Sequence, residues 1–452
     1  MKKNLALSLL FLFLLMSCKN ENGWQELFNG KNLDGWVIKG GKAKFTVEDK
    51  AIVGETVLGN QSTFLCTSKN YGDFILELEL NVDTSMNSGI QFRSQSFPEF
   101  KNGIVHGYQM EVDPSSRGWS GGIYDESRRG WLYTLDSNPE AKTAFKNGEW
   151  NKYRIEAIGN HIMTWINGIQ TADLLDNTDS TGFIALQVHF VFGEENPWTV
   201  GTKVKWRNIR ILTHNLEANR QKTSKEITQI NFIPNKLSDF EKKNGWKLLF
   251  DGVSSSGWRG AYKDKFPEKG WEIKDGTMTV LKAEGKESEN GGDIVTIKEY
   301  KNFELSLDFL ITDSANSGIK YYVTESEKNK GSAIGPEYQI LDDLHHPDAK
   351  LGRDGNRTLA SLYDLIPAKN KRDNAVGLWN NARILANNYH VEHWLNGFKV
   401  LEYNRKSQEF RDLVAISKYK IWEKFGEAEQ GHILLQDHGS KVSFRSIKIR
   451  EL

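Results

Sequence analysis

The chain has 452 residues, with 59 basic and 59 acidic side chains, so its formal net charge is zero. This balance argues against a nucleic acid or another polyanion as a partner, because such ligands select strongly basic surfaces. The length suggests two or three domains. Fourteen Trp, 14 Tyr and 23 Phe beside 40 Gly indicate an aromatic-rich β protein with many tight turns.

The N-terminus has the features of a targeting segment. Two lysines precede an apolar run over 5–16, which is too short for an ordinary membrane span. The run ends at LMSC, residues 15–18, which resembles a bacterial lipobox. We expect a signal peptide over 1–17 and lipidation of Cys18, hence a cell-envelope protein held at the periplasmic face or the cell surface by a lipid anchor. An ordinary signal peptide is the alternative.

Lipidation would leave Cys66 as the one cysteine able to form a disulfide, and it would have no partner in the chain. We therefore expect Cys66 to be a buried apolar residue. The fold must then be stabilised by a hydrophobic core.

The sequence repeats itself. WQELFNGKNLDGW from Trp24 recurs as WKLLFDGVSSSGW from Trp246, and YGDFILELELNVDTSMNSGI from Tyr71 recurs as YKNFELSLDFLITDSANSGI from Tyr300. GEWNKYRI likewise recurs as GLWNNARI. The repeated unit is therefore a whole domain rather than a short solenoid repeat.

Both copies have the pattern of β structure. Apolar residues alternate with polar ones over 74–80 and 303–309, which indicates half-buried strands. Gly-Asn at 159–160 and the Asn-Gly of WINGI and WLNGF are hairpin signals. Many short strands with turn signals predict an all-β sandwich or jelly roll in each copy.

The repeat sets the expected domains. We place the first over 18–213, a polar linker over 214–244, and the second over 245–452. Within the linker, SDFE at 238–241 predicts a capping box that opens a short helix.

Four motifs, taken in order, resemble the bacterial 3-keto-disaccharide hydrolase domain family. They are LFNGKNLDGW, NSGI, GEWNKYRI and a closing LQDHG. The resemblance covers nearly the whole mature chain, twice. It implies a concanavalin-type jelly roll, the architecture of laminarinases and legume lectins. It also implies cleavage of glycosidic bonds in sugars already oxidised at C3, by hydrolysis or by a lyase route.

The segment GPEYQILDDLHHPDA, residues 335–349, holds the densest polar group of the second copy. In a strand, Glu337 and Gln339 share one face, which could meet a sugar. Glu337 is the first candidate for a general base, followed by Asp342 and His438. Further candidates to contact the substrate are Asn316, Arg357, Tyr363 and Gln436.

These residue types suit the chemistry of a 3-keto sugar. The ketone acidifies the hydrogen on C2, which a carboxylate or imidazole can remove as general base. The resulting enolate needs a cation, a hydrogen-bond donor or a metal near O3. Elimination of the glycosidic oxygen, followed by water addition, completes the cleavage. Direct hydrolysis would use paired carboxylates instead.

No cofactor is indicated by a diagnostic motif. Asp343, His345 and His346 include suitable ligands for a divalent metal ion, but they lack a diagnostic spacing. A hydrogen-bonded turn is the favoured interpretation of this loop, and Asp342 could cap it.

In the first copy, HGYQMEVDP carries Gln109 and Glu111 on one face, in the reverse order, so the carboxylate moves about 7 Å along the strand. Glu111 is the catalytic candidate there. The candidates to bind substrate are Arg93, Gln109, Tyr124 and His189. Val188 stands where the second copy has Asp437. The first copy is thus either a second catalytic domain of altered specificity or a binding module.

Both copies contain Asn-Ser-Gly-Ile. We expect Gly89 and Gly318 to permit a tight turn. Asn87 and Asn316 either hold that turn, which is the favoured interpretation, or form hydrogen bonds with the sugar. The leading functional hypothesis is an enzyme that cleaves 3-keto-glycosides. The alternatives are a surface glycan-binding lipoprotein without catalysis and a conventional glycosidase, although the chain lacks the E-x-D-x-x-E run of laminarinases.

Overall fold

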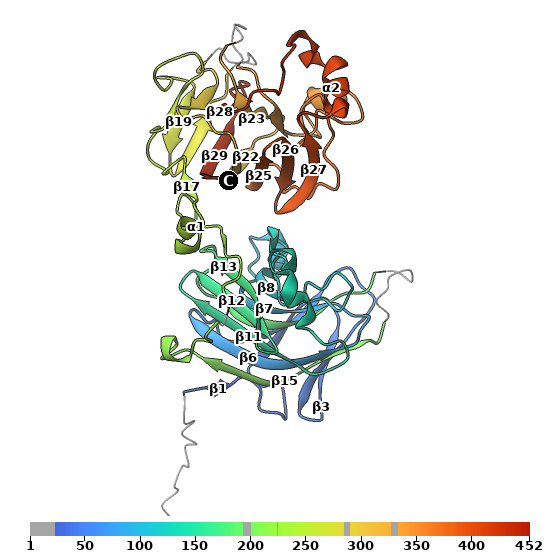
Figure 1. The fold of residues 1–452 in the computed structure, drawn as a ribbon. Coiled ribbons are helices and arrows are strands. Elements are labelled where there is room, and N and C mark those ends of the chain that lie inside the picture. Colours follow the sequence, from blue (N-terminus) through green and yellow to red (C-terminus); the bar gives the residue numbers. More distant parts are fainter. Residues whose placement is uncertain (1–22, 193–199, 224, 284–289, 327–332) are drawn as a thin grey trace, which may run out of the picture. The chain divides into compact units, whose positions relative to one another are not determined.

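The computed structural model describes residues 23–192, 200–223, 225–283, 290–326 and 333–452. The chain divides into two compact units, Met1–Ile230 and Asn231–Leu452, here called the first and second unit (Figure 1). The expected signal peptide and Cys18 lie outside the described residues. No helix in the described part of the chain is long and apolar enough to cross a membrane.

The first unit consists of two antiparallel sheets. The first sheet has the order β16 (Ile230–Asn231), β13 (Ile169–Leu175), β12 (His161–Ile166), β11 (Asn151–Ile158), β6 (Phe74–Val82), β15 (Lys203–Leu212), β4 (Ala51–Glu55) and β3 (Lys44–Glu48), with β1 (Gln25–Glu26) paired to β15. The second has the order β10 (Gly130–Tyr133), β9 (Ile123–Glu126), β8 (His106–Val112), β7 (Ser88–Gln95), β14 (Phe183–Val188), β5 (Thr63–Thr67) and β2 (Trp36–Gly40).

The second unit repeats this arrangement with fewer strands. Its larger sheet has the order β19 (Trp271–Lys274), β20 (Thr277–Val280), β29 (Val442–Glu451), β22 (Phe303–Ile311), β25 (Asn380–Asn387), β26 (His390–Leu395) and β27 (Phe398–Asn404), with β17 (Lys247–Leu248) paired to β29. Its smaller sheet has the order β18 (Trp258–Gly260), β21 (Ile294–Thr296), β28 (His432–Leu435), β23 (Asn316–Val323) and β24 (Glu337–Leu341). The predicted all-β class, with two β-sandwich halves, is confirmed.

Alternation and turn chemistry explain these strands. The apolar residues of 74–80 and 303–309 are buried as expected, in β6 and β22. Asn167 and Gly168 form the two-residue turn between β12 and β13, with φ of 50° and 82°, which suits a type I′ hairpin. Cys66 is a free, buried thiol on β5, and burial raises its pKa to about 12. It therefore packs as a small apolar residue.

Short helices complete the fold. Helix α1 (Asp239–Lys243) opens with the predicted capping box between Ser238 and Glu241. Helix α2 (Gln408–Ala415) lies in the second unit, between β27 and β28. The single-turn helices are η1 (Lys101–Gly103), η2 (Leu135–Ser137), η3 (Pro139–Thr143), η4 (Glu217–Asn219), η5 (Pro347–Lys350) and η6 (Lys418–Ile421).

Candidate active site

In each unit, one face of the smaller sheet bears a row of polar side chains. In the first unit, β7, β8 and β14 direct Ile90, Met110 and Leu186 to one face, in register. Their neighbours Gly89, Gln91, Gln109, Glu111 and Gln187 therefore share the opposite face, because strand side chains alternate. We call this side of the sheet the polar face. In the second unit the polar face carries Asn316, Gly318, Lys320, Glu337 and Gln339, on β23 and β24.

Glu337 begins β24 and is 4% exposed. A Cβ added to Gly318 would lie 2.4 Å from Oε1 of Glu337, so the carboxylate lies directly over this glycine. The hydroxyl of Tyr419 is 3.5 Å from Oε2 of Glu337 and donates to it. Gly318 therefore leaves room for the candidate base, which explains the repeated glycine by close packing across strands rather than by the turn that we predicted.

Lys320 is the one functional candidate on this face that sequence reasoning missed. It pairs across the strands with Glu337 and is 5% exposed. Its Nζ lies 3.8 Å from Oδ2 of Asp293, which is also buried. A buried ammonium beside a buried carboxylate can stabilise an anion that forms on a bound substrate. The period-two pattern of NSGIKYY put Lys320 on the face of Gly318, and that signal was available in the sequence.

The side-chain amides of Gln339 and Asn316 lie on the polar face of the second unit, in positions that can bind a ligand. Gln339 donates from Nε2 to Oδ1 of Asn316 at 3.4 Å. Its Oε1 is buried and has no hydrogen-bond partner among the described residues. Buried polar atoms are nearly always paired, so an unpaired oxygen here indicates a missing partner such as a sugar hydroxyl. Asn316 contacts the polar row, and not the turn to which we assigned it.

Arg357 and Tyr363 belong to one hydrogen-bonded network. Arg357 donates to Oδ1 of Asp364 and to Oδ1 of Asp348, both at 2.9 Å. The Tyr363 hydroxyl donates to Oδ2 of Asp348 at 2.7 Å, while its backbone N–H donates to the carbonyl of Glu337. Burial and the neighbouring carboxylates of Asp348 and Glu337 raise the pKa of Tyr363. The network therefore keeps Tyr363 protonated and fixed beside β24.

Asp342 caps the loop after β24. Its carboxylate accepts the backbone N–H groups of Ser314, Leu344 and His345, and it contacts Nδ1 of His345 at 2.8 Å. Burial would raise the pKa of Asp342, but these hydrogen bonds lower it. These are the contacts of the structural turn, which was the favoured interpretation of this loop.

The three proposed metal ligands make separate contacts. Asp343 pairs with Lys371, His345 with Asp342, and His346 accepts the N–H of Asp348. A different trio, Asp313, Asp342 and His345, has ligand atoms within 4.8 Å of one another. Carboxylate and imidazole donors suit a divalent ion, although Asp313 and His345 are exposed.

The closing motif after β28 supplies two further groups. Asp437 accepts the N–H groups of Gly291, Gly292 and Gly439, so it ties together two loops. The ring of His438 is half-buried, 6.3 Å from that of His346, and the rings meet edge to face. Burial, and then the charge of His438, lower the pKa of His346. Gln436, also in this motif, is buried, and its backbone N–H donates to the carbonyl of Gly318.

The first unit places its carboxylate differently. Glu111 pairs across the strands with Gly89 and accepts from Asn87 and, at 3.1 Å, from Gln109. Burial raises the pKa of Glu111 to about 7, even though these two hydrogen bonds lower it. Gln109 in turn accepts from Gln91 at 2.6 Å. Glu111 is therefore a carboxyl group that titrates near neutral pH within a row of amides.

Glu126 is a second unusual carboxyl group on this face. Burial raises its pKa to about 7, and Nε2 of Gln187 contacts it at 3.4 Å. Oε1 of Gln187 is buried and unpaired among the described residues. Tyr124 lies on the same strand, edge to face with Trp131 at 5.2 Å. The first unit thus also presents an unsatisfied amide oxygen.

Two other candidates of the first unit make local contacts. The Arg93 guanidinium donates to the carbonyls of Gly72, Ala157 and Gly159 and pairs with Asp73. These bonds hold loops of the unit together. His189 stacks on Phe190, and burial lowers its pKa.

Comparison with known proteins connects this chain to a family. The model of the 3-keto-alpha-glucoside-1,2-lyase-like domain matches residues 23–212 and again residues 245–450. A 3-keto-disaccharide hydrolase of Bacteroides thetaiotaomicron is 38% identical over 230 residues, which are 46% of this chain and 79% of that protein.

Solved structures are similar to one half of the chain at a time. A provisionally assigned glycosyl hydrolase of Parabacteroides distasonis is 31% identical and matches along its whole length, over 49% of this chain, with a TM-score of 0.43. A carbohydrate-binding module of Bacillus subtilis is 14% identical, over 39% of this chain and 94% of its own, with a TM-score of 0.26. Both halves of the chain match the same family model. The chain therefore belongs to the 3-keto-disaccharide hydrolases and 3-keto-glucoside lyases, a family of enzymes that act on 3-keto sugars.

Proposed function

We propose that the second unit cleaves the glycosidic bond of 3-keto-glycosides by elimination. The observation that carries this proposal is the cross-strand pair of Glu337 and Lys320, a buried carboxylate opposite a buried ammonium. Elimination next to a ketone needs these two groups, a base for the hydrogen on C2 and a cation for the enolate oxygen at C3.

In this mechanism, Glu337 removes the proton from C2, and the electron pair moves to O3 to form an enolate that Lys320 stabilises. The electron pair then returns, the C1–O bond breaks, and a double bond forms between C1 and C2. The departing oxygen takes a proton, for which the half-buried imidazole of His438 is the candidate donor. Water then adds to C1. Gln339 supplies an acceptor for a sugar hydroxyl through its unpaired Oε1.

The test is to incubate the full chain with a 3-keto-glucoside and with its unoxidised parent, in heavy water and in heavy-oxygen water, and to analyse the products by mass spectrometry. We expect aglycone release from the keto compound alone, with deuterium at C2. Release without deuterium at C2 would favour direct hydrolysis. No release from any keto-glycoside, with or without divalent metal ions, would overturn the proposal.

For the first unit we propose sugar binding. Its polar face has Gln91 where the second unit has Lys320, so it offers amides to hydroxyl groups but no cation at that position. The same chain would then bind an unoxidised glycan in one unit and cleave a keto sugar in the other. A Gln187→Ala variant that retains full glycan affinity would contradict this assignment.

We further propose that Cys18 carries the lipid anchor that the lipobox-like LMSC motif predicts. Expression in a bacterium fed an alkyne fatty acid should label the wild-type chain and not Cys18→Ala. Equal labelling of both chains would exclude lipidation at this residue.

A further inference from the structure

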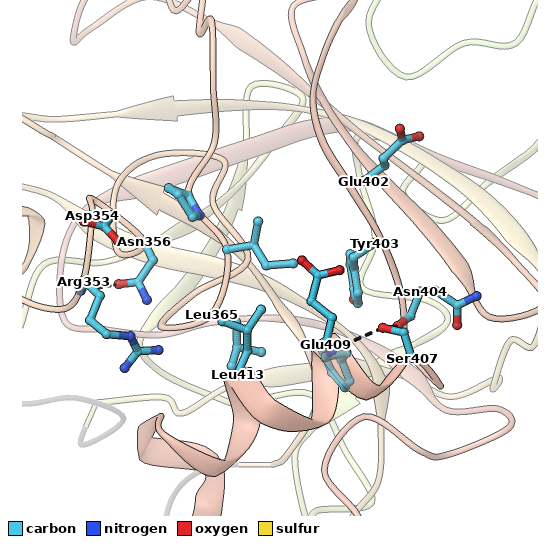
Figure 2. Close-up of a pocket in the computed structure, with 13 residues that line it drawn as sticks. Arg353, Asp354, Asn356, Leu365, Glu402, Tyr403, Asn404, Ser407, Glu409 and Leu413 are labelled. Atoms are coloured by element: carbon cyan, nitrogen blue, oxygen red, sulfur yellow. Dashed lines mark hydrogen bonds between the residues drawn. The ribbon is translucent and has the colours of Figure 1, made fainter.

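A hollow of about 280 Å³ lies in the second unit, and none of its lining residues belongs to the candidate active site. It lies between helix α2, the end of β27 and the loop that carries residues 353–367 (Figure 2). This volume lies just below the range of typical ligand pockets, about 300–1,000 Å³. The hollow is therefore large enough for one small ligand.

One wall of the hollow is apolar. It is formed by Leu365, Ile366 and Pro367 of the loop, and by Phe410 and Leu413 of helix α2. Leu413 packs against the core cluster that contains Leu365, and both side chains line the hollow (Figure 2). Such a wall favours a ligand with a hydrocarbon face, such as the C–H groups of a sugar ring.

Asn356 contributes a hydrogen-bond donor, its Nδ2 amide group, that has no partner among the described residues. Its side chain is 1% exposed, and its Oδ1 accepts the N–H of Arg353 at 2.9 Å, which fixes the orientation of the amide. Its Nδ2 is buried and has no hydrogen-bond partner among the residues that the structure describes. Asn356 lines the hollow, and buried donors are almost always paired, so an acceptor oxygen bound there would satisfy this donor.

The charges on the rim decide what kind of acceptor fits. Three acidic residues and one basic residue line the hollow. The acidic residues are Asp354, Glu402 and Glu409, and the basic residue is Arg353. Arg353 is already committed to the carbonyls of Ile416, at 2.8 Å, and Asp364, at 3.2 Å. An excess of carboxylates repels a phosphate or a uronate. A neutral hydroxyl group suits both the unpaired donor and the acidic rim. It can accept a hydrogen bond from Asn356 and can donate one to the exposed carboxylate of Glu409.

We propose that this hollow is a second binding site of the second unit, for a neutral monosaccharide unit. A ring hydroxyl accepts a hydrogen bond from Nδ2 of Asn356, a second hydroxyl donates to Glu409, and the C–H face of the ring packs on Leu365 and Leu413. The proposal is independent of the cleavage reaction, since it requires binding only.

The hollow belongs to the second unit alone because an insertion builds it. Between β13 and β14 the first unit has only residues 176–182, whereas residues 405–431 separate β27 and β28 in the second. This longer segment contains α2 and then Tyr419, which contacts Glu337. The segment 405–431 thus lines the hollow and, through Tyr419, also contacts the candidate base Glu337.

The test measures binding of methyl glucoside, glucosamine and glucose 6-phosphate to the intact chain by calorimetry. None of the three probes carries the 3-keto group that cleavage needs. Asn356→Asp keeps an oxygen for the N–H of Arg353 but replaces the free donor by an acceptor. Leu413→Trp fills the hollow from helix α2. All chains are measured in a Gln187→Ala background, which removes the sugar binding proposed for the polar face of the first unit.

We expect methyl glucoside to bind and glucose 6-phosphate not to bind. Asn356→Asp and Leu413→Trp should each weaken the binding of methyl glucoside about tenfold, the equivalent of one lost hydrogen bond or contact face. An unchanged thermal unfolding midpoint would show that both variants fold. The proposal is overturned if no probe binds, if only glucosamine or the phosphate binds, or if both variants bind like wild type.

Discussion

In the first unit the carboxylate of β8 stands opposite a glycine, whereas in the second unit the carboxylate of β24 stands opposite a lysine. The strand register is otherwise the same, since Gly89 pairs with Glu111 and Gly318 pairs with Gln339. Exchanging the order of Glu and Gln shifts the acidic group by two residues, about 7 Å along the strand. One scaffold therefore presents a carboxyl group among amides in one unit and a carboxylate–ammonium pair in the other.

The units also differ in what covers the polar face. In the second unit the long segment between β27 and β28 brings Tyr419 to Glu337. In the first unit the short connection contributes Asp176, which pairs with Arg129 and accepts from the Tyr108 hydroxyl. Tyr108 lies on the face opposite Gln109 and Glu111, so these contacts of the short connection are made on the apolar side of the sheet and not on the polar face. The comparison predicts that keto-glycoside cleavage belongs to the second unit.

Glu337→Gln is the variant with the largest expected effect. It keeps the shape of the side chain and removes the base, so cleavage of a 3-keto-glucoside should fall by about 10²–10⁴-fold. The matched variant Glu111→Gln should retain the wild-type rate. Steady-state release of aglycone measures both. If Glu111→Gln loses activity and Glu337→Gln keeps it, the units have been assigned the wrong way round.

Lys320→Gln, which copies Gln91 of the first unit, should have the next largest effect. Loss of the cation at the enolate oxygen should lower kcat by about 10²–10³-fold. It also leaves the buried Asp293 without its ammonium, a change that costs up to about 3–5 kcal/mol of stability when a buried pair is broken.

The two effects of Lys320 can be separated. Adding Asp293→Asn to Lys320→Gln removes the uncompensated charge, so urea unfolding should move back toward wild type while activity stays low. If activity returns together with stability, Lys320 acts only by holding the fold and takes no part in the reaction.

Much of the fold could be predicted from the sequence because its signals are local. The alternation of 303–309, the turn at Asn167 and Gly168, and the capping box of Ser238 each depend on a few neighbouring residues. The pairing of β23 with β24 depends on register between distant segments, which the sequence does not state. Alternation alone puts Lys320 on the face of Gly318, but its position opposite Glu337 depends on this register.

The remaining features of the site depend on packing. The sequence shows Asn316 and Gly318 as parts of a turn-like motif, yet their roles come from a side chain on the neighbouring strand. Helix α2 and the hollow beside it lie in a segment without a repeat partner, so comparison of the two copies gave no information about them. The unpaired oxygen of Gln339 becomes visible only when all its neighbours are placed.

Gly318→Ala tests the packing of the candidate base, with a smaller effect. The new Cβ would lie 2.4 Å from Oε1 of Glu337 and must displace this side chain, which can move without unfolding the strand. We expect activity to fall by about 10–100-fold, because small displacements of a catalytic group are costly, with little change in thermal stability. Gly89→Ala is the control, since its Cβ would meet Gln109 instead. Equal losses in both variants would contradict a special role for Gly318.

The smallest expected effect is a dependence of first-unit stability on pH. Burial raises the pKa of Glu111 and of Glu126 from 4.5 to about 7. Between these values the folded unit holds protons that the unfolded chain has released. The free energy of unfolding should therefore fall as pH rises from about 4.5 to 7 and level off above pH 7.

Hydrogen exchange of the β8 amides at several pH values, corrected for the intrinsic exchange rate, measures this stability. Glu111→Gln removes one of the two titrating groups, so its profile should have about half the slope of wild type between pH 5 and 7. The β24 amides of the second unit provide the internal reference. A flat wild-type profile in this range would mean that Glu111 is ionised in the folded unit, and the first unit would then present an anion among its amides. That result would weaken the contrast between the two polar faces.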